Sequence, residues 1–265
     1  MSSIGLDLVN TLLVEPSTTQ QKLISGYLQV SGIQLIEHAG TGAQALASMR
    51  SNVPDLVISA MYFDDMDGVR LLETMRHDPQ LRDVPFILIS SETSLKMLDP
   101  IRQGGVIAIL TKPFSQQSMH RALLSTLDFL NPEKLDLDQG GFAEELKVLI
   151  VDDSVTARHH IRNTLNALGI EDITEAANGR EAIGQITTNY FDFIVTDYNM
   201  PEMDGRELIE FIRTKSSQPT LPILMVTSES DMRRLAAVEQ GGASAICDKP
   251  FEINMVRSLI KKLIK

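Results

Sequence analysis

Runs of apolar, largely β-branched residues alternate along the chain with segments of helical periodicity. In the C-terminal half, the apolar runs predict strands at 147–152, 172–176, 192–197, 222–228 and 243–249. Amphipathic helices are predicted between and after them, near 155–168, 179–189, 205–215, 231–241 and 252–264. Strands that are apolar almost throughout, separated by amphipathic helices, are typical of a parallel sheet covered on both faces. The pattern therefore predicts a doubly wound α/β fold with a five-stranded parallel sheet.

The pattern occurs twice, at an offset of 137 residues. Leu146–Ser154 repeats Val9–Ser17, and the Met-Asp-Gly at 203–205 and the Lys-Pro-Phe at 249–251 repeat those at 66–68 and 112–114. About 30 of roughly 105 aligned positions are identical without a gap. A period this long indicates a duplicated domain and not a solenoid. We therefore predict two α/β domains in tandem, at 1–130 and 147–265, joined by an acidic linker at 131–146.

The predicted linker contains five acidic residues, one lysine, one proline and a glycine pair. Two interpretations are open. A solvated spacer explains this composition most simply, and a docking segment tuned by its charge is the alternative.

Composition narrows the class of protein. The 265 residues are 43% hydrophobic and carry a formal net charge of −11, so we expect a folded chain without the basic surface of a nucleic-acid binder. The single cysteine, Cys247, excludes an internal disulfide or CxxC site and fits a reducing compartment. No leader-like N-terminus and no uninterrupted apolar stretch of membrane-spanning length is present. We expect a cytoplasmic protein that binds neither nucleic acid nor membrane.

Candidate chemistry lies at the carboxyl ends of the predicted strands of the second copy, where ligands of doubly wound folds bind. The polar residues there are Asp152, Asp153, Asp197, Thr227, Ser228 and Lys249. Three carboxylates on one edge require a counter-charge, and oxygen ligands without His or Cys favour Mg²⁺. A lysine and small hydroxyl donors suit phosphoryl oxygens, and a carboxylate beside them can act as a nucleophile. A single Asp after a strand is more often a helix cap, but the joint pattern favours a functional site.

These residues stand in the motifs VDDS (151–154), DYNMPEMDG (197–205), VTSES (226–230) and DKPF (248–251). With them the second copy resembles the receiver domain of two-component response regulators, particularly the stand-alone chemotaxis type. The resemblance implies that Asp197 accepts a phosphoryl group from the phosphohistidine of a histidine kinase. It also implies a set of Mg²⁺ ligands, namely Asp152, Asp153, Asp197 and the backbone carbonyl of Asn199, with Asp152 acting through water. The phosphoryl group would be bound by Thr227, Ser228 and Lys249, and a cis peptide bond would precede Pro250.

One position departs from the family pattern. The family's switch aromatic usually precedes the lysine by three residues, and Ile246 occupies that place. The resemblance also implies an output surface made by the fourth helix, fifth strand and fifth helix, which would contact a downstream protein.

The first copy keeps the pattern of the fold but not the chemistry. At the equivalent positions it has Glu15, Pro16, Ala60, Tyr62 and Ser90, and only Lys112 is unchanged. Its core positions stay apolar at Leu12, Val14, Ile58, Ile87 and Ile89. Asp64 and Asp65 are poor replacement acceptors because they lie in the loop beyond the strand end. We predict a degenerate receiver, or pseudo-receiver, in the first copy.

The leading hypothesis is a response regulator that signals by phosphorylation-dependent protein contact. It would be a signalling protein and not an enzyme, and we expect no DNA-binding output domain after residue 265. The alternative is a constitutive scaffold of paired receiver domains in which phosphorylation is vestigial. A hydrolase of the aspartyl-phosphate type is disfavoured because Asp152 and Asp153 are adjacent and not in a DxD spacing.

Overall fold

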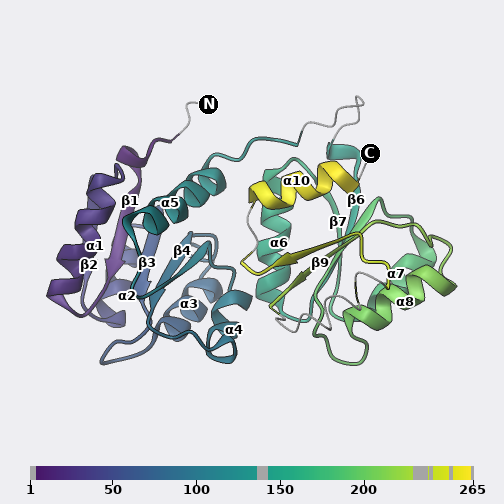
Figure 1. The fold of residues 1–265 in the computed structure, drawn as a ribbon, viewed down its shortest axis with the longest axis horizontal. Helices are drawn as coiled ribbons and strands as arrows, with labels where there is room; N and C mark the ends of the chain where they lie inside the picture. Colours follow the sequence, from purple (N-terminus) through teal and green to yellow (C-terminus); the bar gives the residue numbers. More distant parts are fainter. Residues whose placement is uncertain (1–3, 136–142, 229–237, 239–240, 251–252, 264–265) are drawn as a thin grey trace. The chain divides into compact units, whose positions relative to one another are not determined.

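The computed structural model describes residues 4–135, 143–228, 238, 241–250 and 253–263, which form two compact units (Figure 1). The first unit is Met1–Asn131 and the second is Pro132–Lys265. Nearly all of the helix predicted at 231–241 lies outside the described residues. So do residues 229, 230 and 251 of the family motifs and the centre of the predicted linker, 136–142.

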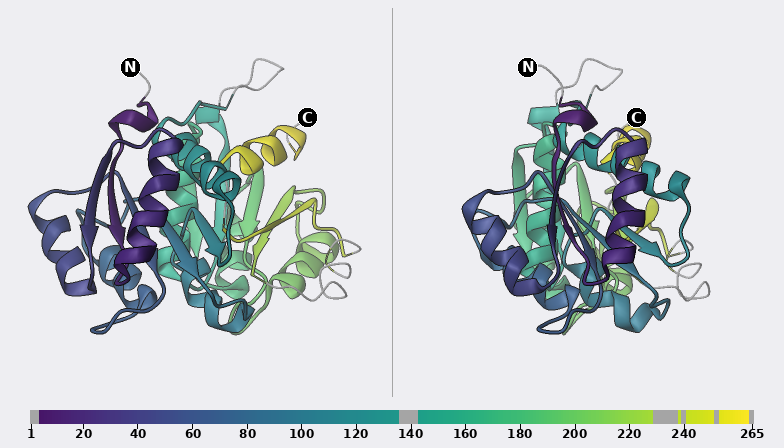
Figure 2. Two further views of the ribbon diagram at one scale, coloured as in Figure 1. Left: turned by 60° about the vertical axis from the view of Figure 1, so that its left-hand side comes forward. Right: turned by 90° about the vertical axis from the view of Figure 1, so that its left-hand side faces the viewer.

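The first unit contains a five-stranded parallel sheet in the order β2-β1-β3-β4-β5. Its elements are η1 (Leu6–Leu8), β1 (Asn10–Val14), α1 (Thr18–Val30), β2 (Leu35–Ala39), α2 (Gly42–Ser51), β3 (Leu56–Ala60), α3 (Gly68–His77), β4 (Phe86–Ser90), α4 (Leu95–Gln103), β5 (Ala108–Thr111) and α5 (Gln116–Leu130). Helices α1 and α5 cover one face of the sheet, and α2, α3 and α4 cover the other (Figure 2).

The second unit has the same topology, with the strands in the order β7-β6-β8-β9-β10. Its described elements are η2 (Ala143–Glu145), β6 (Lys147–Val151), α6 (Val155–Ala167), β7 (Asp172–Ala176), α7 (Gly179–Thr188), β8 (Phe193–Thr196), α8 (Gly205–Lys215), β9 (Ile223–Thr227), β10 (Ala245–Asp248) and α10 (Ile253–Leu263). Helices α6 and α10 pack on one face, and α7 and α8 on the other. The predicted fold class is confirmed in both units.

The element boundaries differ from the predictions only at the ends. Most strands of the second unit are one or two residues shorter than predicted, because the flanking polar residues and Pro222 lie outside the hydrogen-bonded ladder. The core positions named in the first copy are almost fully buried, at 0–1% exposure, as expected for a retained fold.

The 131–146 segment is not a free spacer at its described ends. Leu135 and Ala143 are buried in the core of the second unit, and the backbone N–H of Leu135 donates to the carbonyl of Leu168 at 2.8 Å. Arg257 of α10 also pairs with Glu133. The described apolar residues of the segment, Leu135, Ala143 and Leu146, therefore pack with the second unit despite its acidic composition.

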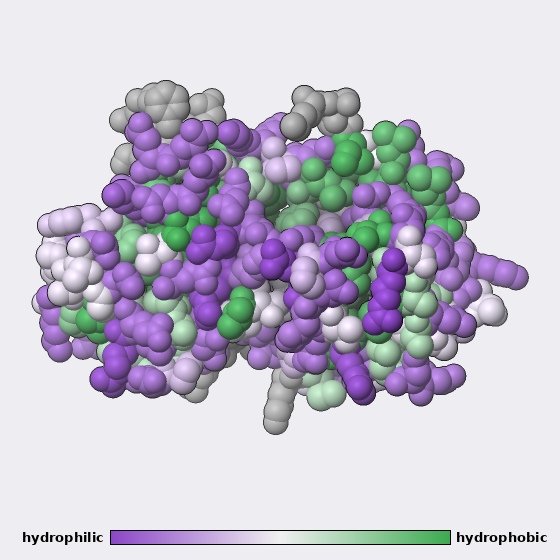
Figure 3. Space-filling view, turned by 180° about the vertical axis from the view of Figure 1, so that it is seen from behind, coloured by the Kyte–Doolittle hydropathy of each residue, from purple (hydrophilic) through white to green (hydrophobic). Residues whose placement is uncertain are grey.

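The surface is largely hydrophilic. In the view of Figure 3, polar side chains cover most of the visible face, and apolar ones occur in separate groups. Among the described residues, no helix combines the length and apolar character required to cross a bilayer.

A partly buried arginine braces each unit at the same repeat position. Arg76 of α3 donates to the backbone carbonyls of Arg82, Val84, Gly104 and Gly105 at 2.8–3.0 Å. Arg213 of α8 bonds in the same way to the carbonyls of Pro219, Leu221 and Gly242. Burial lowers the pKa of Arg76 to about 10, so the side chain stays charged at neutral pH. Each arginine thus ties the loop before the fourth strand to the turn before the fifth.

Replacing Arg76 by Met removes the donors for four backbone carbonyls and should lower the free energy of unfolding by about 2–4 kcal/mol. The control is Arg82→Met, which removes an exposed side chain and should change it by less than about 0.5 kcal/mol. Urea unfolding of the full chain followed by circular dichroism measures both. Equal stability of the two variants would show that the arginine does not brace the fold.

Candidate functional site

Asp152, Asp197 and Lys249 meet at the carboxyl edge of the second sheet. The Nζ of Lys249 lies 2.9 Å from Oδ2 of Asp152 and 3.0 Å from Oδ1 of Asp197. All three side chains are buried, with 4% exposure for the lysine and 1% or less for the carboxylates. The structure thus brings together three of the residues predicted from the sequence, from the ends of three different strands.

Backbone groups fix the two carboxylates. Oδ1 of Asp152 accepts from the N–H of Ser154, and Oδ2 of Asp197 accepts from the N–H of Asn199. Ser154 in turn caps the N-terminus of α6. Gly205 permits the loop after Asp197 to fold back on the strand end, because a Cβ there would clash with the carbonyl oxygen of Asp197. The glycine of the Met-Asp-Gly motif therefore allows the loop after Asp197 to pack closely against the strand end.

Arg158, a residue that the sequence analysis did not identify, contacts the backbone of Asp152. Arg158 of α6 donates to the backbone carbonyl of Asp152 at 2.6 Å and pairs with Glu175 of β7 at 3.0 Å. Burial alone raises the pKa of Glu175, but hydrogen bonds from Arg162 and Arg158 outweigh it and hold the pKa below its usual value. The sequence could have indicated Arg158, because it lies one helical turn after Ser154 and therefore on the same face of the helix.

Two hydroxyl residues follow the fourth strand of the unit. Thr227 ends β9 and is fully buried, and its backbone carbonyl accepts from the N–H of Lys249 at 2.9 Å. The Oγ of Ser228 is buried without a hydrogen-bond partner in the part of the chain that the structure describes. The peptide bond between Lys249 and Pro250 is cis, as predicted. Ile246, at the position of the family's switch aromatic, packs against the apolar core.

The cluster carries an excess of negative charge. Burial raises the pKa of Asp197 to about 6; Lys249 opposes this shift, and repulsion from Asp152 adds to it. Burial by itself lowers the pKa of Lys249, but the charges of Asp197 and Asp152 outweigh it and raise the pKa. One ammonium therefore offsets only one of the two carboxylate charges, and the site favours an additional cation.

The other predicted metal ligands are exposed. Asp153 follows Asp152 at the surface, and Asn199 lies in the loop after β8. Within the described residues, no three His, Cys, Asp or Glu side chains are already grouped as a metal site, because Lys249 engages both buried carboxylates. The available donors are nevertheless all oxygens, and the cluster has uncompensated negative charge. This chemistry fits Mg²⁺.

The equivalent edge of the first unit has a different arrangement. Lys112 is 27% exposed and forms one ion pair, 3.3 Å from Oε2 of Glu15. Ala60 stands where Asp197 does, so no acceptor carboxylate is present at this strand end. The Oγ of Ser90 accepts from the N–H of Glu92. The single acid and the lysine neutralise each other, which leaves no excess charge for a cation.

Asp65 has a structural role in the first unit. Its two carboxylate oxygens accept from the N–H groups of Gly42 and Ala43 at 3.0 and 2.8 Å. These two hydrogen bonds lower the pKa of Asp65. The carboxylate thus caps the N-terminus of α2.

Comparison with known proteins is consistent with this geometry. A family model described as the response regulator receiver domain matches residues 11–124 and 148–261. The chemotaxis protein CheY of Pseudomonas aeruginosa is 37% identical over 120 residues, which are 45% of this chain and 97% of the relative. CheY-3 of Vibrio cholerae is 34% identical over 122 residues, covering 46% and 94%. The solved structure of V. cholerae CheY4 covers 44% of this chain and 98% of its own, with 35% identity and a TM-score of 0.41.

In Mg²⁺-free buffer, Asp197→Asn should stabilise the protein at pH 7 by about 1–3 kcal/mol. The pKa of Asp197 is raised to about 6 from an ordinary 3.8, so its ionised form destabilises the native state, and asparagine removes that charge. Wild-type stability falls as the pH rises through 6. The advantage of the variant should therefore be complete above that pH and vanish near pH 4.

Urea unfolding at several pH values measures the difference. The control is Glu210→Gln on the exposed side of α8, which should change stability by less than about 0.5 kcal/mol. A destabilised Asp197→Asn variant at pH 7 would contradict the excess of negative charge.

Proposed function

The chain belongs to the response regulator receiver family, and from this premise we propose that its second domain accepts a phosphoryl group on Asp197. Proteins of this family are signalling components of two-component systems. They interact in general with histidine kinases and with downstream targets, and they generally bind Mg²⁺ at the phosphorylation site. The observation that carries the proposal is the buried cluster of Asp152, Asp197 and Lys249, which occurs in the second unit and has no equivalent acceptor in the first.

The transfer would proceed from the phosphohistidine of a kinase. A carboxylate oxygen of Asp197 attacks the phosphorus, the phosphorus–nitrogen bond breaks, and the imidazole leaves with its electron pair and takes up a proton. When bound, Mg²⁺ would neutralise charge on the phosphoryl oxygens, held by Asp152, Asp153, Asp197 and the carbonyl of Asn199.

Lys249, Thr227 and Ser228 would bind the oxygens of the phosphoryl group that Asp197 accepts. The ammonium of Lys249 lies next to the attacking carboxylate and can pair with a phosphoryl oxygen. Ser228 has a buried hydroxyl without a partner among the described residues, so it can donate without breaking an existing bond. Thr227 adds a second hydroxyl at the end of β9.

Phosphorylation would change the surface of the domain that a downstream protein contacts. The new charge would rearrange the contacts of Lys249, which precedes the cis bond to Pro250 and lies four residues before the start of α10 at Ile253. We propose that the face formed by the fourth helix, fifth strand (β10) and fifth helix (α10) of this domain contacts a downstream protein in the cytoplasm. Since Ile246 replaces the usual aromatic, the signal would pass through Thr227 and the backbone of β10 without an aromatic flip.

The first domain would act without phosphorylation. Its Glu15–Lys112 pair is complete without a ligand, and Ala60 cannot accept a phosphoryl group. We propose that it is a constitutive docking or regulatory module beside a phosphorylated partner domain. The scaffold hypothesis is thus retained for the first domain, and the second domain is proposed to act through phosphorylation.

Incubation of the full chain with acetyl phosphate and Mg²⁺ tests the proposal. Intact-mass measurement should show one phosphoryl group per chain, and peptide mapping should place it on Asp197. EDTA and the Asp197→Asn variant should each abolish it. The control variant Asp65→Asn, in the first domain, should be modified as the wild type is. Uptake by Asp197→Asn, or label mapped to the first domain, would refute the assignment.

A further inference from the structure

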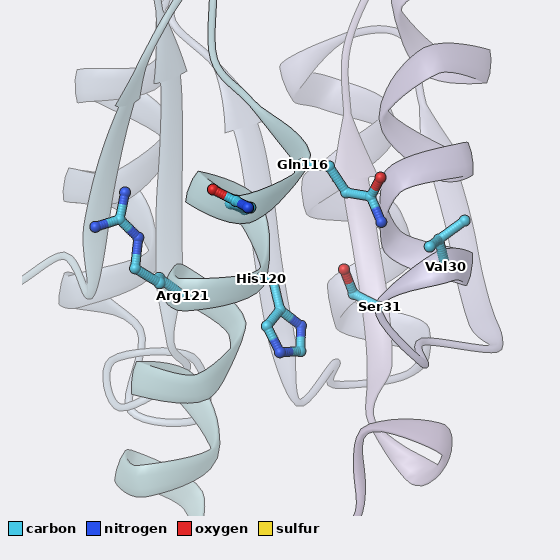
Figure 4. Close-up of a pocket in the computed structure, with 6 residues that line it drawn as sticks. Val30, Ser31, Gln116, His120 and Arg121 are labelled. Atoms are coloured by element: carbon cyan, nitrogen blue, oxygen red, sulfur yellow. The ribbon is translucent and has the colours of Figure 1, made fainter.

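A pocket of about 760 Å³ opens in the first unit between the C-terminal end of α1 and the first turns of α5. It is lined by Val30, Ser31, Gln116, Gln117, His120 and Arg121. In Figure 4, His120 and Gln116 point from α5 toward the end of α1, and Arg121 projects from the other side of α5. The volume lies within the range of pockets that hold small ligands or short peptide segments.

Five of the six lining residues have polar side chains, and none of the six is a carboxylate. Two amides, an imidazole and a guanidinium come from α5, although the chain as a whole has a net charge of −11. The Oγ of Ser31 is buried, and it has no hydrogen-bond partner within the described ranges. A buried hydroxyl without a partner is costly unless a ligand supplies one. The pocket is therefore suited to a polar occupant with negative charge.

The second unit shows what occupies the equivalent groove. At the offset of 137 residues, Ser31 corresponds to Leu168 at the end of α6, and His120 corresponds to Arg257 of α10. In that groove lies the chain's own segment 133–135. Arg257 donates to the backbone carbonyl of Glu133 at 2.8 Å and to its carboxylate at 3.2 Å.

The same segment is fixed at its other end to α6. The N–H of Leu135 donates to the carbonyl of Leu168 at 2.8 Å, and both leucine side chains are buried in one apolar cluster. This segment of three residues, Glu133-Lys134-Leu135, thus connects the end of the first helix to the fifth helix of the domain, and its one carboxylate pairs with Arg257. In the first unit, the equivalent parts of α1 and α5 line the open pocket.

From this internal comparison we propose that the α1–α5 pocket of the first domain binds a peptide segment of a partner protein that carries acidic side chains. His120 takes the place of Arg257 as the donor on α5, and Arg121 adds a cation where the second unit has Ser258. The hydroxyl of Ser31 replaces the apolar side chain of Leu168 and offers a hydrogen bond. The pocket is thus more polar than its counterpart and selects for acidic over apolar side chains.

The test uses a fluorescein-labelled peptide with the sequence NPEKLDLD, residues 131–138, which contains the known occupant of the equivalent groove. Fluorescence anisotropy with the full chain measures the affinity, and amide NMR spectra locate the site. Binding should shift the signals of Ser31, Gln117, His120 and Arg121. Arg121→Glu, an exposed substitution that leaves the fold intact, should weaken binding at least about tenfold.

Two controls make the result specific. Arg50→Glu, at the exposed end of α2, makes the same charge reversal elsewhere, and this variant should bind the peptide like the wild type. The peptide NPQKLNLN, in which amides replace the acidic side chains, should bind to the wild type at least about tenfold more weakly. Equal binding of the peptide without acidic side chains, equal binding by Arg121→Glu, or shifts confined to the surroundings of Arg257 would overturn the proposal. Concentration-dependent shifts of the pocket signals without peptide would also overturn it, since they would identify a second copy as the occupant.

Discussion

The buried ammonium of Lys249, shared by Asp152 and Asp197, is the interaction on which the chemistry of the second domain depends. Three charges are withdrawn from water at the end of a parallel sheet, and their sum is negative. Burying charges costs several kcal/mol for each ion unless partners offset it, and here the offset is incomplete, as the raised pKa of Asp197 shows. A site in this state gains stability from a cation, and in the proposed reaction Lys249 would exchange its ion pair with a carboxylate for one with a phosphoryl group. The excess charge that destabilises the native fold is thus what suits the site to its proposed chemistry.

The two domains show that the fold and the site can vary separately. Both keep the strand order, the bracing arginine at the end of the third helix, and the lysine followed by a cis proline. These features hold the backbone and do not require an acceptor. In the first domain, one long acid, Glu15, reaches the lysine and closes a neutral pair, so loss of the carboxylate at Ala60 leaves no unpaired charge behind. At this strand end of the first domain, the lysine thus has a charge partner within its own domain.

Much of this was predictable because the sequence contains the pattern twice. Alternating apolar runs and amphipathic segments specify a covered parallel sheet, and strand ends in such a sheet converge, so Asp152, Asp197 and Lys249 could be grouped from their positions alone. The shift in the pKa of Asp197 was not predictable, because it depends on how completely each side chain is buried. Neither was the role of Arg76 and Arg213, whose partners are backbone carbonyls with no signature in the sequence. The packing of Leu135 was also not predictable, because the acidic composition of residues 131–146 favoured a solvated spacer.

The most direct test of the central claim is an amide NMR titration of the full chain with beryllofluoride and Mg²⁺, which together mimic a bound phosphoryl group. If the Asp152–Asp197–Lys249 cluster is the only competent site, signals near Thr227 and Lys249 should shift, and those of Glu15, Ser90 and Lys112 should stay unchanged. Shifts around Glu15 and Lys112, or no shifts around Lys249, would contradict the account.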